Sequence, residues 1–352
     1  MVSRTGFTIL AHLFPLNWGP YYFQRGKRPS RAQLFLLLQA IRTKELVMKL
    51  LNRGHRLEKR ISASELRLRR RYTAFTVEEP SMDDSPITDR PPLRLLWMVH
   101  PKDFGVLHHS VHGALRHVKN PVKEIVFISP SSKLTEAHLQ SRVEFDVPVR
   151  YLDDGAFLSP KDSHKLVAAI GGHAGWASSQ LIKVNFILSG DSTPTFMVDS
   201  DTVLLADKQW LYAGGRQLLY SRWYDNPRYE KYLRHWGFEE MDPLRSFITH
   251  HTLFQPDLLR GLMEEAFGGY ELSQLVEAVV SGSRELGFPE FCIDDEPYGQ
   301  LLFKHYPERV VSDKYSNVNM VPARTDWDIL RTLESLRASE RYNSVSFHNP
   351  ER

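Results

Sequence analysis

Two aspartates, Asp199 and Asp201, directly follow a short apolar run at residues 196–198. Such a run predicts a buried strand, so acids at its end are expected at the rim of a sheet. In open α/β sheets, ligands bind at the carboxyl ends of the strands. Adjacent carboxylates repel each other unless a cation lies between them, and Mg²⁺ and Mn²⁺ prefer oxygen ligands. The triplet predicts a divalent-metal site, although Asp-X-Asp also occurs by chance.

Further residues able to do chemistry lie on both sides of these acids. Upstream, residues 175–188 have apolar side chains at helical spacing. Downstream, a strand-like run at residues 246–251 ends in two histidines, and three consecutive acids precede an apolar segment. The polar and aromatic residues of these segments, together with a Lys-Asp pair after the first apolar run, are Lys102, Asp103, Trp176, Gln180, Lys183, His250, His251, Asp294, Asp295, Glu296 and Tyr298.

In this order the chain resembles GT-A glycosyltransferases, and most closely a poorly characterised bacterial family of glycosyltransferase-like proteins. In that family a Lys-Asp pair ends the first strand, and a Trp, Gln and Lys share the helix before the metal acids. A His follows, and a Glu-X-Glu-X-Tyr-Gly segment closes the site. The resemblance covers about residues 93–310. The chain departs from the family at Asp294, which replaces the first acid of the last segment, and at Asp295, which replaces an aromatic residue.

The resemblance implies a metal-dependent enzyme that moves a sugar from a nucleotide-diphosphate donor to a hydroxyl acceptor, such as a cell-surface glycan or glycolipid. The cofactor would be Mn²⁺ or Mg²⁺. The resemblance places five residues in the donor site, together with Asp199. These five are Lys102, Asp103, Trp176, Gln180 and Lys183. A sixth candidate, Asp154, comes from its position and not from the resemblance: with Asp153 it ends another expected strand and could hold the base or ribose, although a Leu-Asp-Asp-Gly turn would explain both acids equally well.

Sugar transfer leaves negative charge on the departing phosphate, so a cation is needed there. Asp201 is the first candidate ligand, and Asp199 would share the metal or hold the ribose. His250 or His251 would complete the coordination; because side chains alternate along a strand, only one of the pair should face the site. A histidine in this position can also be purely structural. Lys183 would reach, from its helix, either the diphosphate or an acid near the nucleotide base.

The acceptor hydroxyl needs a general base, and crowding among Asp294, Asp295 and Glu296 should raise the pKa of at least one of them. Glu296 is the first candidate because it keeps its spacing to Tyr298, and Asp294 is the second. The three acids would also suit the start of a helix, with Pro297 in its first turn.

Charge divides the chain into two parts. Residues 1–72 contain 16 Lys+Arg and 3 Glu, a net charge of +13; the remaining 29 basic and 39 acidic residues give −10. Residues 73–92 have linker composition. We therefore expect a basic helical region at 1–72, a linker at 73–92, a catalytic domain at 93–334 and a flexible tail at 335–352. The single cysteine excludes an intrachain disulfide, and a cytoplasmic location is expected.

The basic region contains an apolar stretch at residues 6–23 that two prolines and two polar residues interrupt, so it is not expected to span a bilayer. A basic amphipathic helix is predicted at about residues 30–60. Such helices lie on anionic membrane surfaces or bind partner proteins. A solvated helix packed on the catalytic domain or a coiled-coil segment is the alternative. Nucleic-acid binding is a third option, which no recognised motif supports.

From residue 93 onward, strands alternate with helices, which predicts an α/β fold with a mostly parallel, Rossmann-like sheet. Strands are expected at 93–99, 124–129, 147–152, 195–198, 217–220 and 247–251. Helices are expected at 106–118, 161–170, 176–188, 256–267, 272–281 and 298–304. No dinucleotide or P-loop glycine motif is present. Two other functions stay open: a metal-dependent phosphohydrolase and a non-catalytic nucleotide-sugar-binding protein.

Overall fold

The computed structural model describes residues 90–223, 227–238, 245–287, 292–320 and 325–348. The chain divides into two units, Met1–Val77 and Glu78–Arg352, and all described residues belong to the second. The expected basic region and nearly all of the expected linker therefore lie outside the described residues. Within the described part of the chain, no helix is both long enough and apolar enough to cross a membrane.

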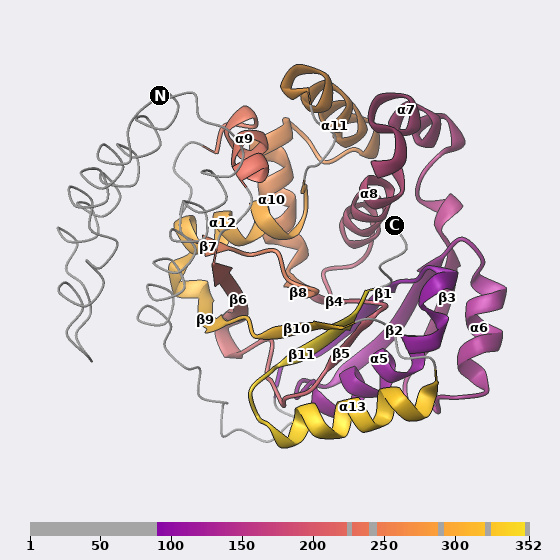
Figure 1. The fold of residues 1–352 in the computed structure, drawn as a ribbon. Helices are drawn as coiled ribbons and strands as arrows, with labels where there is room; N and C mark the ends of the chain where they lie inside the picture. The colour runs from indigo at the N-terminus through magenta and orange to yellow at the C-terminus, as the bar shows by residue number, and fades with distance from the viewer. Residues whose placement is uncertain (1–89, 224–226, 239–244, 288–291, 321–324, 349–352) are drawn as a thin grey trace, which may run out of the picture. The chain divides into compact units, whose positions relative to one another are not determined.

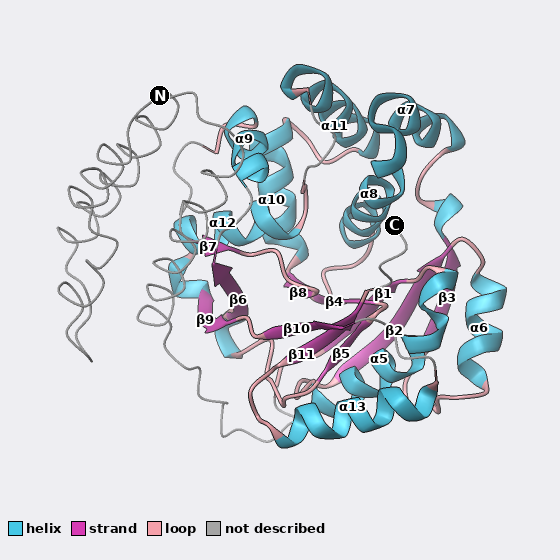
Figure 2. Cartoon of the chain, viewed as in Figure 1, coloured by secondary structure: helices cyan, strands magenta, loops and turns pink. Residues whose placement is uncertain are grey.

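The described elements include both strands and helices, which Figure 2 distinguishes by colour. The strands are β1 (Leu93–Met98), β2 (Val122–Ser129), β3 (Val149–Asp153), β4 (Thr195–Asp199), β5 (Thr202–Leu204), β6 (Gln217–Trp223), β7 (Arg245–Ser246), β8 (His251–Phe254), β9 (Val310–Lys314), β10 (Asn317–Met320) and β11 (Ser344–Phe347). The α-helices are α5 (Phe104–His117), α6 (Ser132–Gln140), α7 (Pro160–Ile170), α8 (Ala174–Ser189), α9 (Pro227–His235), α10 (Pro256–Phe267), α11 (Leu272–Leu286), α12 (Asp295–His305) and α13 (Asp326–Ala338). Short 3₁₀ helices are η2 (Pro101–Asp103), η3 (Asp154–Ala156), η4 (Gly171–His173), η5 (Ala213–Gly215) and η6 (Pro307–Arg309).

The central sheet has five strands in the order β3-β2-β1-β4-β8. The first four are parallel, and β8 pairs antiparallel with β4. This arrangement confirms the predicted fold class. Parallel sheets are covered on both faces, which explains why β1, β2 and β4 are nearly continuous apolar runs.

Helices cover both faces of the central sheet (Figure 1). Along β1, Leu95 and Trp97 belong to the apolar cluster that includes α5, whereas Leu96 belongs to the cluster that includes α7, α8, α10 and α11. This alternation follows from the two-residue period of a strand, which directs successive side chains to opposite faces.

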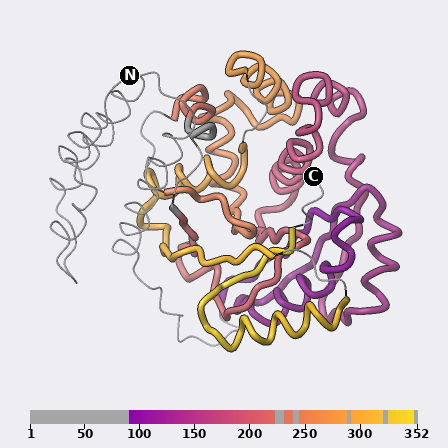
Figure 3. The backbone as a smooth tube through the Cα atoms, in the orientation of Figure 1, coloured from indigo at the N-terminus to yellow at the C-terminus, as the bar shows by residue number. Residues whose placement is uncertain are grey.

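Two three-stranded sheets complete the unit, in the orders β10-β11-β5 and β7-β6-β9. Strand β5 follows β4 after a two-residue turn and pairs antiparallel with β11. Figure 3 traces the C-terminal segment, in yellow, from α13 back to these strands. Of the strands in these two sheets, only β6 corresponds to a strand that the sequence clearly predicted.

Two sequence predictions about the second half are wrong. The expected flexible tail at 335–352 instead contains the end of α13 and the strand β11, where Val345 and Phe347 are fully or almost fully buried. The expected strand at 247–251 is split, because the chain leaves β7 at Ser246 and resumes extended pairing only at His251. The N–H of Phe247 donates to a buried carboxylate of Glu296 instead of to a neighbouring strand.

Candidate active site at the carboxyl end of the central sheet

Asp199 is the last residue of β4, which lies where the strand order of the sheet reverses. Strands β2 and β3 lie on one side of β1, and β4 lies on the other. A reversal of this kind creates a crevice outside the carboxyl ends of the strands, where ligands bind in open α/β sheets. Met98, the last residue of β1, is the register partner of Asp199. The predicted acids are therefore at the switch point of the sheet.

Asp199 is paired with His250, the residue that precedes β8. Because β8 is antiparallel to β4, its first residues lie beside the end of β4. The Asp199 N–H donates to the His250 carbonyl oxygen over 2.9 Å, and the His250 Nδ1 lies 2.9 Å from the Asp199 Oδ2. The Asp199 side chain is 42% exposed. This pair is accessible to a ligand.

Asp201 is paired with a histidine that sequence analysis missed. The N–H of Phe347, the last residue of β11, donates to the Asp201 carbonyl oxygen, and the next residue, His348, places its Nδ1 3.1 Å from the Asp201 Oδ2. Burial by itself would raise the pKa of Asp201, but the hydrogen bond and charge of His348 outweigh it and lower that pKa. The same hydrogen bond raises the pKa of His348.

The two pairs meet at the end of the sheet, since the rings of His250 and His348 have centroids 4.9 Å apart. Two carboxylates and two imidazoles form a donor set that suits Mn²⁺. Among the described residues, no three of these four side chains hold ligand atoms within 4.8 Å of one another. The donor types fit a divalent ion, but one ion could be shared only if these side chains moved closer together. Each acid would then exchange part of its contact with histidine for the ion.

His251 points away from the acids, as the expectation that one histidine of the pair faces the site requires. It is 1% exposed, and its ring packs edge-on against Trp210, Tyr220 and Tyr315, at centroid distances of 5.2, 5.4 and 5.5 Å. Desolvation by burial lowers its pKa to about 3. His251 is thus a neutral core residue, and His250 is the one of the pair that faces Asp199.

Lys102 and Asp103, in the 3₁₀ helix η2 after β1, lie beside the same acids. The Ser200 hydroxyl donates to the Asp103 Oδ2 over 2.7 Å, which ties the turn between Asp199 and Asp201 to η2. Burial raises the pKa of Asp103, although the hydrogen bond from Ser200 acts to lower it. The Lys102 Nζ is 3.9 Å from the Asp103 Oδ1. The predicted Lys-Asp pair therefore lies at the end of the sheet that carries Asp199 and Asp201, which we call the acid edge.

A cleft of about 500 Å³ opens at the carboxyl ends of β1 and β2, and Met98, the register partner of Asp199, lines it. This volume is within the range of small-molecule sites. Its walls come from the ends of β1 and β2, from η3 and from the starts of α7 and α8. Asp154 lines it, and burial raises the pKa of that carboxyl. Asp153 faces elsewhere, since its Oδ1 accepts from the Ser132 N–H at the start of α6.

Lys183 and Asp294 form a buried ion pair that joins α8 to the start of α12. Their Nζ and Oδ2 atoms are 2.6 Å apart, and the two residues are 5% and 2% exposed. Burial by itself would lower the pKa of Lys183 and raise that of Asp294, but their mutual attraction reverses both shifts. The Asp294 Oδ1 also accepts from Cys292 Sγ and from the Asp295 N–H. Its capacity to accept hydrogen bonds is largely used.

Asp295 differs from its neighbours because its Oδ1 is buried and has no hydrogen-bond partner among the described residues. Burial raises its pKa well above the ordinary value, and the negative charges of Asp294 and Asp199 raise it further. A hydrogen bond with Thr252 of β8 acts in the opposite direction and lowers the pKa. An unpaired carboxyl oxygen with a raised pKa has the properties of a general base.

Glu296, the first candidate for the base, is fully buried. Its Oε2 accepts from the Ser246 hydroxyl and the Phe247 N–H, at 2.8 and 2.7 Å, and its Oε1 accepts from Gln300. A carboxylate in this environment holds the chain between β7 and β8 and does not reach solvent. The order of the three candidates changes, and Asp295 comes first.

The rest of the predicted segment is structural. The Tyr298 hydroxyl donates to Gln217 and accepts from the Gln255 N–H inside the core. A Cβ added at Gly299 would lie 2.2 Å from the Phe247 Cβ, so only glycine lets α12 pack this closely. Tyr298 and Gly299 therefore anchor α12 in the core, and their fixed spacing from the acids follows from this anchoring.

Gln180 and Trp176 occupy α8 in two different environments. The Gln180 side-chain oxygen accepts from the Ile293 N–H, which fixes the chain just before the acids of α12. Trp176 is 40% exposed in the first turn of α8. Its neighbour Gly175 lines the cleft. Gln180 positions the acids, and Trp176 is next in the chain to a residue that lines the cleft.

Comparisons with known proteins give matches only among solved structures. No protein-family model and no curated protein matches the chain. Mouse xyloside xylosyltransferase 1 matches with 13% identity and a TM-score of 0.41, covering 72% of this chain and 97% of that one.

Two further structures are also glycosyltransferases. The mannosyltransferase Ktr4p of S. cerevisiae, solved with GDP, matches with 11% identity and a TM-score of 0.43, covering 68% of this chain and 75% of its own. The bifunctional glycosyltransferase WbbM matches with 14% identity and a TM-score of 0.37, covering 75% of this chain and 47% of its own. Similarities of this size do not assign an activity or a substrate to the chain.

Proposed function

We propose that this protein is a metal-dependent glycosyltransferase that transfers a sugar from a nucleoside-diphosphate donor to a hydroxyl acceptor. The observation that carries the proposal is the arrangement at the switch point of the sheet. Two acid–histidine pairs lie at this end of the sheet, and a cleft of about 500 Å³ is lined by Met98, the register partner of Asp199. The start of α12 holds a buried carboxyl, that of Asp295, with an unpaired oxygen.

Each part of this arrangement has a place in such a reaction. Asp199, Asp201, His250 and His348 would hold Mn²⁺ or Mg²⁺, which supplies positive charge against the diphosphate. The cleft beside η3 would accept the base and ribose of the donor, where Asp154 offers a hydrogen-bonding carboxyl.

The acceptor would lie on the α12 side of the metal acids. There the unpaired Oδ1 of Asp295 can take the proton of an acceptor hydroxyl. A general base works best when its pKa is near the working pH, and burial raises the pKa of Asp295 in that direction. The Lys183–Asp294 pair keeps the backbone of Asp295 in place through the Asp295 N–H. In this scheme Lys183 acts as a positioning residue and does not touch the diphosphate.

A thermal-shift screen of UDP-, GDP-, CMP- and dTDP-sugars, each with and without Mn²⁺, tests the proposal. A ligand at 100 times its dissociation constant stabilises the native state by about 2.7 kcal/mol. We expect one nucleotide class to raise the melting temperature only when Mn²⁺ is present. Asp201→Asn should abolish that shift, whereas Glu334→Gln, an exposed change on α13, should keep it.

Turnover separates this proposal from the two other functions. Release of the sugar to water alone would indicate a hydrolase, and metal-dependent binding without any reaction would indicate a binding protein. Unchanged Mn²⁺-dependent nucleotide binding in Asp201→Asn would contradict the assignment of the metal site.

We also propose that residues 1–72 bring the enzyme to an anionic membrane surface, which suits a glycolipid acceptor. The support is their net charge of +13, since each basic residue near such a surface can contribute about 1 kcal/mol. The full chain should sediment with phosphatidylserine vesicles but not with phosphatidylcholine vesicles, and chain 73–352 should sediment with neither. Equal sedimentation of both forms would show that this region does not bind the membrane.

A further inference from the structure

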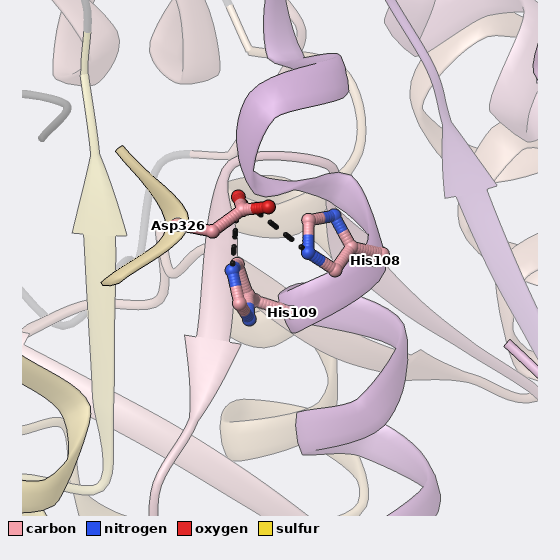
Figure 4. Close-up of side chains that lie close together, drawn as sticks. All are labelled: His108, His109 and Asp326. Atoms are coloured by element: carbon pink, nitrogen blue, oxygen red, sulfur yellow. Dashed lines mark ion pairs between the residues drawn. The ribbon is translucent and has the colours of Figure 1, made fainter. Parts of the chain in front are cut away.

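Three side chains capable of binding a metal converge where α5 meets α13. His108 and His109 lie in the second turn of α5, and Asp326 is the first residue of α13 (Figure 4). In the part of the chain that the structure describes, this is the one group of three whose ligand atoms all lie within 4.8 Å of one another. It shares no residue with the proposed active site.

The distances in this cluster match those of a coordination sphere. The Asp326 Oδ1 lies 3.7 Å from the His108 Nε2 and 3.5 Å from the His109 Nε2. In a tetrahedral zinc site with bonds of about 2.0–2.1 Å, neighbouring ligand atoms are about 3.4 Å apart. Both distances are also too long for good hydrogen bonds. An ion between the three atoms would need only small movements of the side chains.

The environment favours a metal over an ordinary ion pair. His108 and His109 are 8% and 6% exposed, and the two imidazoles are in contact, with ring centroids 3.9 Å apart. Burial and the neighbouring histidine lower the pKa of His108 to about 4, and burial lowers that of His109. Burial thus disfavours the protonated, positively charged form of both rings, whereas Asp326 favours it.

Neutral imidazoles are ready metal ligands, because no proton has to be displaced. The His109 Nε2 has no hydrogen-bond partner among the described residues other than this distant carboxylate contact. Imidazole and carboxylate together suit Zn²⁺ and related transition metals. Asp326, which is exposed, leaves the cluster open to an ion from solvent.

We propose that His108, His109 and Asp326 form a binding site for a transition-metal ion of the Zn²⁺ class, which fastens the start of α13 to α5. Water would occupy the fourth coordination position, as in other sites with three protein ligands.

The position of the cluster in the chain gives the ion a structural role. Helix α13 leads directly into β11, whose end carries His348, the partner of Asp201. Helix α5 carries Ser110, whose hydroxyl donates to the Asp199 carbonyl oxygen. An ion bound between the two helices would stabilise both supports of the acid edge, without taking part in any reaction there.

Zn²⁺ binding by the full chain tests this site, measured by calorimetry in excess Mg²⁺ and by metal content after dialysis. We expect one Zn²⁺ per chain in the wild type and in Asp201→Asn, whose metal acid belongs to the other site. Asp326→Asn and His109→Gln should each bind Zn²⁺ at least about tenfold more weakly, since loss of even an outer contact of a metal site costs this much. His164→Gln, an exposed change on α7, is the control.

Asp326 is exposed, so Asp326→Asn should fold even if the change at the buried His109 disturbs α5. Co²⁺ in place of Zn²⁺ should give the visible absorption of a tetrahedral site in the wild type and lose it in Asp326→Asn. A wild-type chain that binds no Zn²⁺, or binding that is unchanged in both variants, would overturn the proposal. Neither result would bear on the nucleotide site, because that site is tested with Mn²⁺ and Asp201→Asn.

Discussion

Asp199 and Asp201 at the end of β4 and the three acids at the start of α12 look alike in sequence, but the protein treats their charges in opposite ways. At the strand end, each carboxylate is paired with a histidine, and Asp199 is half-exposed whereas Asp201 is more buried. In α12 the acids are buried, and each is accommodated separately: Asp294 by an ion pair, Glu296 by hydrogen bonds and Asp295 by a raised pKa.

The difference follows from solvation. A carboxylate near water keeps its charge at little cost and can exchange a protein partner for a ligand, whereas a buried one needs a fixed partner or must hold a proton. The strand end is therefore suited to binding a cation, and the start of α12 is suited to holding one reactive carboxyl in a fixed place. Changes in each group should have distinct consequences.

The largest effect on stability is expected from Lys183→Met. Removing the lysine leaves Asp294 charged and unpaired in the core, and breaking a buried pair in this way costs about 3–5 kcal/mol. Urea denaturation followed by circular dichroism would measure the loss. The double variant Lys183→Met with Asp294→Leu should recover much of it, because no buried charge remains. A loss below about 1 kcal/mol in the single variant would contradict the burial of this pair.

Asp295→Asn should separate catalysis from stability. The native carboxyl has an unpaired buried oxygen, so the neutral amide should leave stability at pH 7 unchanged or higher. If Asp295 is the base, turnover should fall by at least about 10²-fold, the lower end of what a general base contributes. Donor affinity, measured by thermal shift, should stay the same. Full turnover with normal stability would remove Asp295 from the mechanism.

Glu296→Gln should show the reverse pattern. One of the donors to the carboxylate would face an amide N–H₂ group, so we expect a loss of about 1–3 kcal/mol in stability. Turnover per folded molecule should be retained, since Glu296 does not reach solvent.

The stability loss in Glu296→Gln should also depend on pH. Burial raises the pKa of Glu296 above 4.5, so folding favours its protonated form. Its contribution to stability is fully present below pH 4.5 and declines as pH rises through the folded-state pKa. Denaturation of both proteins between pH 4 and pH 7 should therefore show a larger difference at pH 4. A difference that grows with pH would show that the carboxylate is stabilised in its charged form.

The end of β4 was predictable from the sequence, but the roles of the acids of α12 were not. The apolar runs of β1, β2 and β4 were sufficient to predict a mostly parallel sheet and to place Asp199 and Asp201 at its edge. The choice among the three acids of α12 was not predictable, because it depends on Ser246 and Phe247, which are about 50 residues away in the chain. Those contacts also broke the strand that the apolar pattern predicted at 247–251.

His348 was missed for a different reason. The polar residues after α13 hid a short alternating run, Ser344–Phe347, whose two apolar side chains fill a small cluster against β5. This two-residue period was visible in the sequence, but four residues are too few to outweigh their polar surroundings. Pairing with β5 on one side and β10 on the other makes the strand, and the pairing with β5 brings His348 to Asp201.

The smallest effect is expected from His348→Gln, which sharpens the contrast at the acid edge itself. Glutamine keeps a hydrogen bond to Asp201 but offers a metal an amide oxygen in place of an imidazole, so Mn²⁺-dependent nucleotide affinity should fall about tenfold, or about 1.4 kcal/mol. The matched variant His250→Gln should cause a similar loss, because both histidines face a metal acid. His251→Gln, in the core, should lower stability and leave the affinity of the folded protein unchanged. Normal affinity in both His348→Gln and His250→Gln would limit the metal ligands to Asp199 and Asp201.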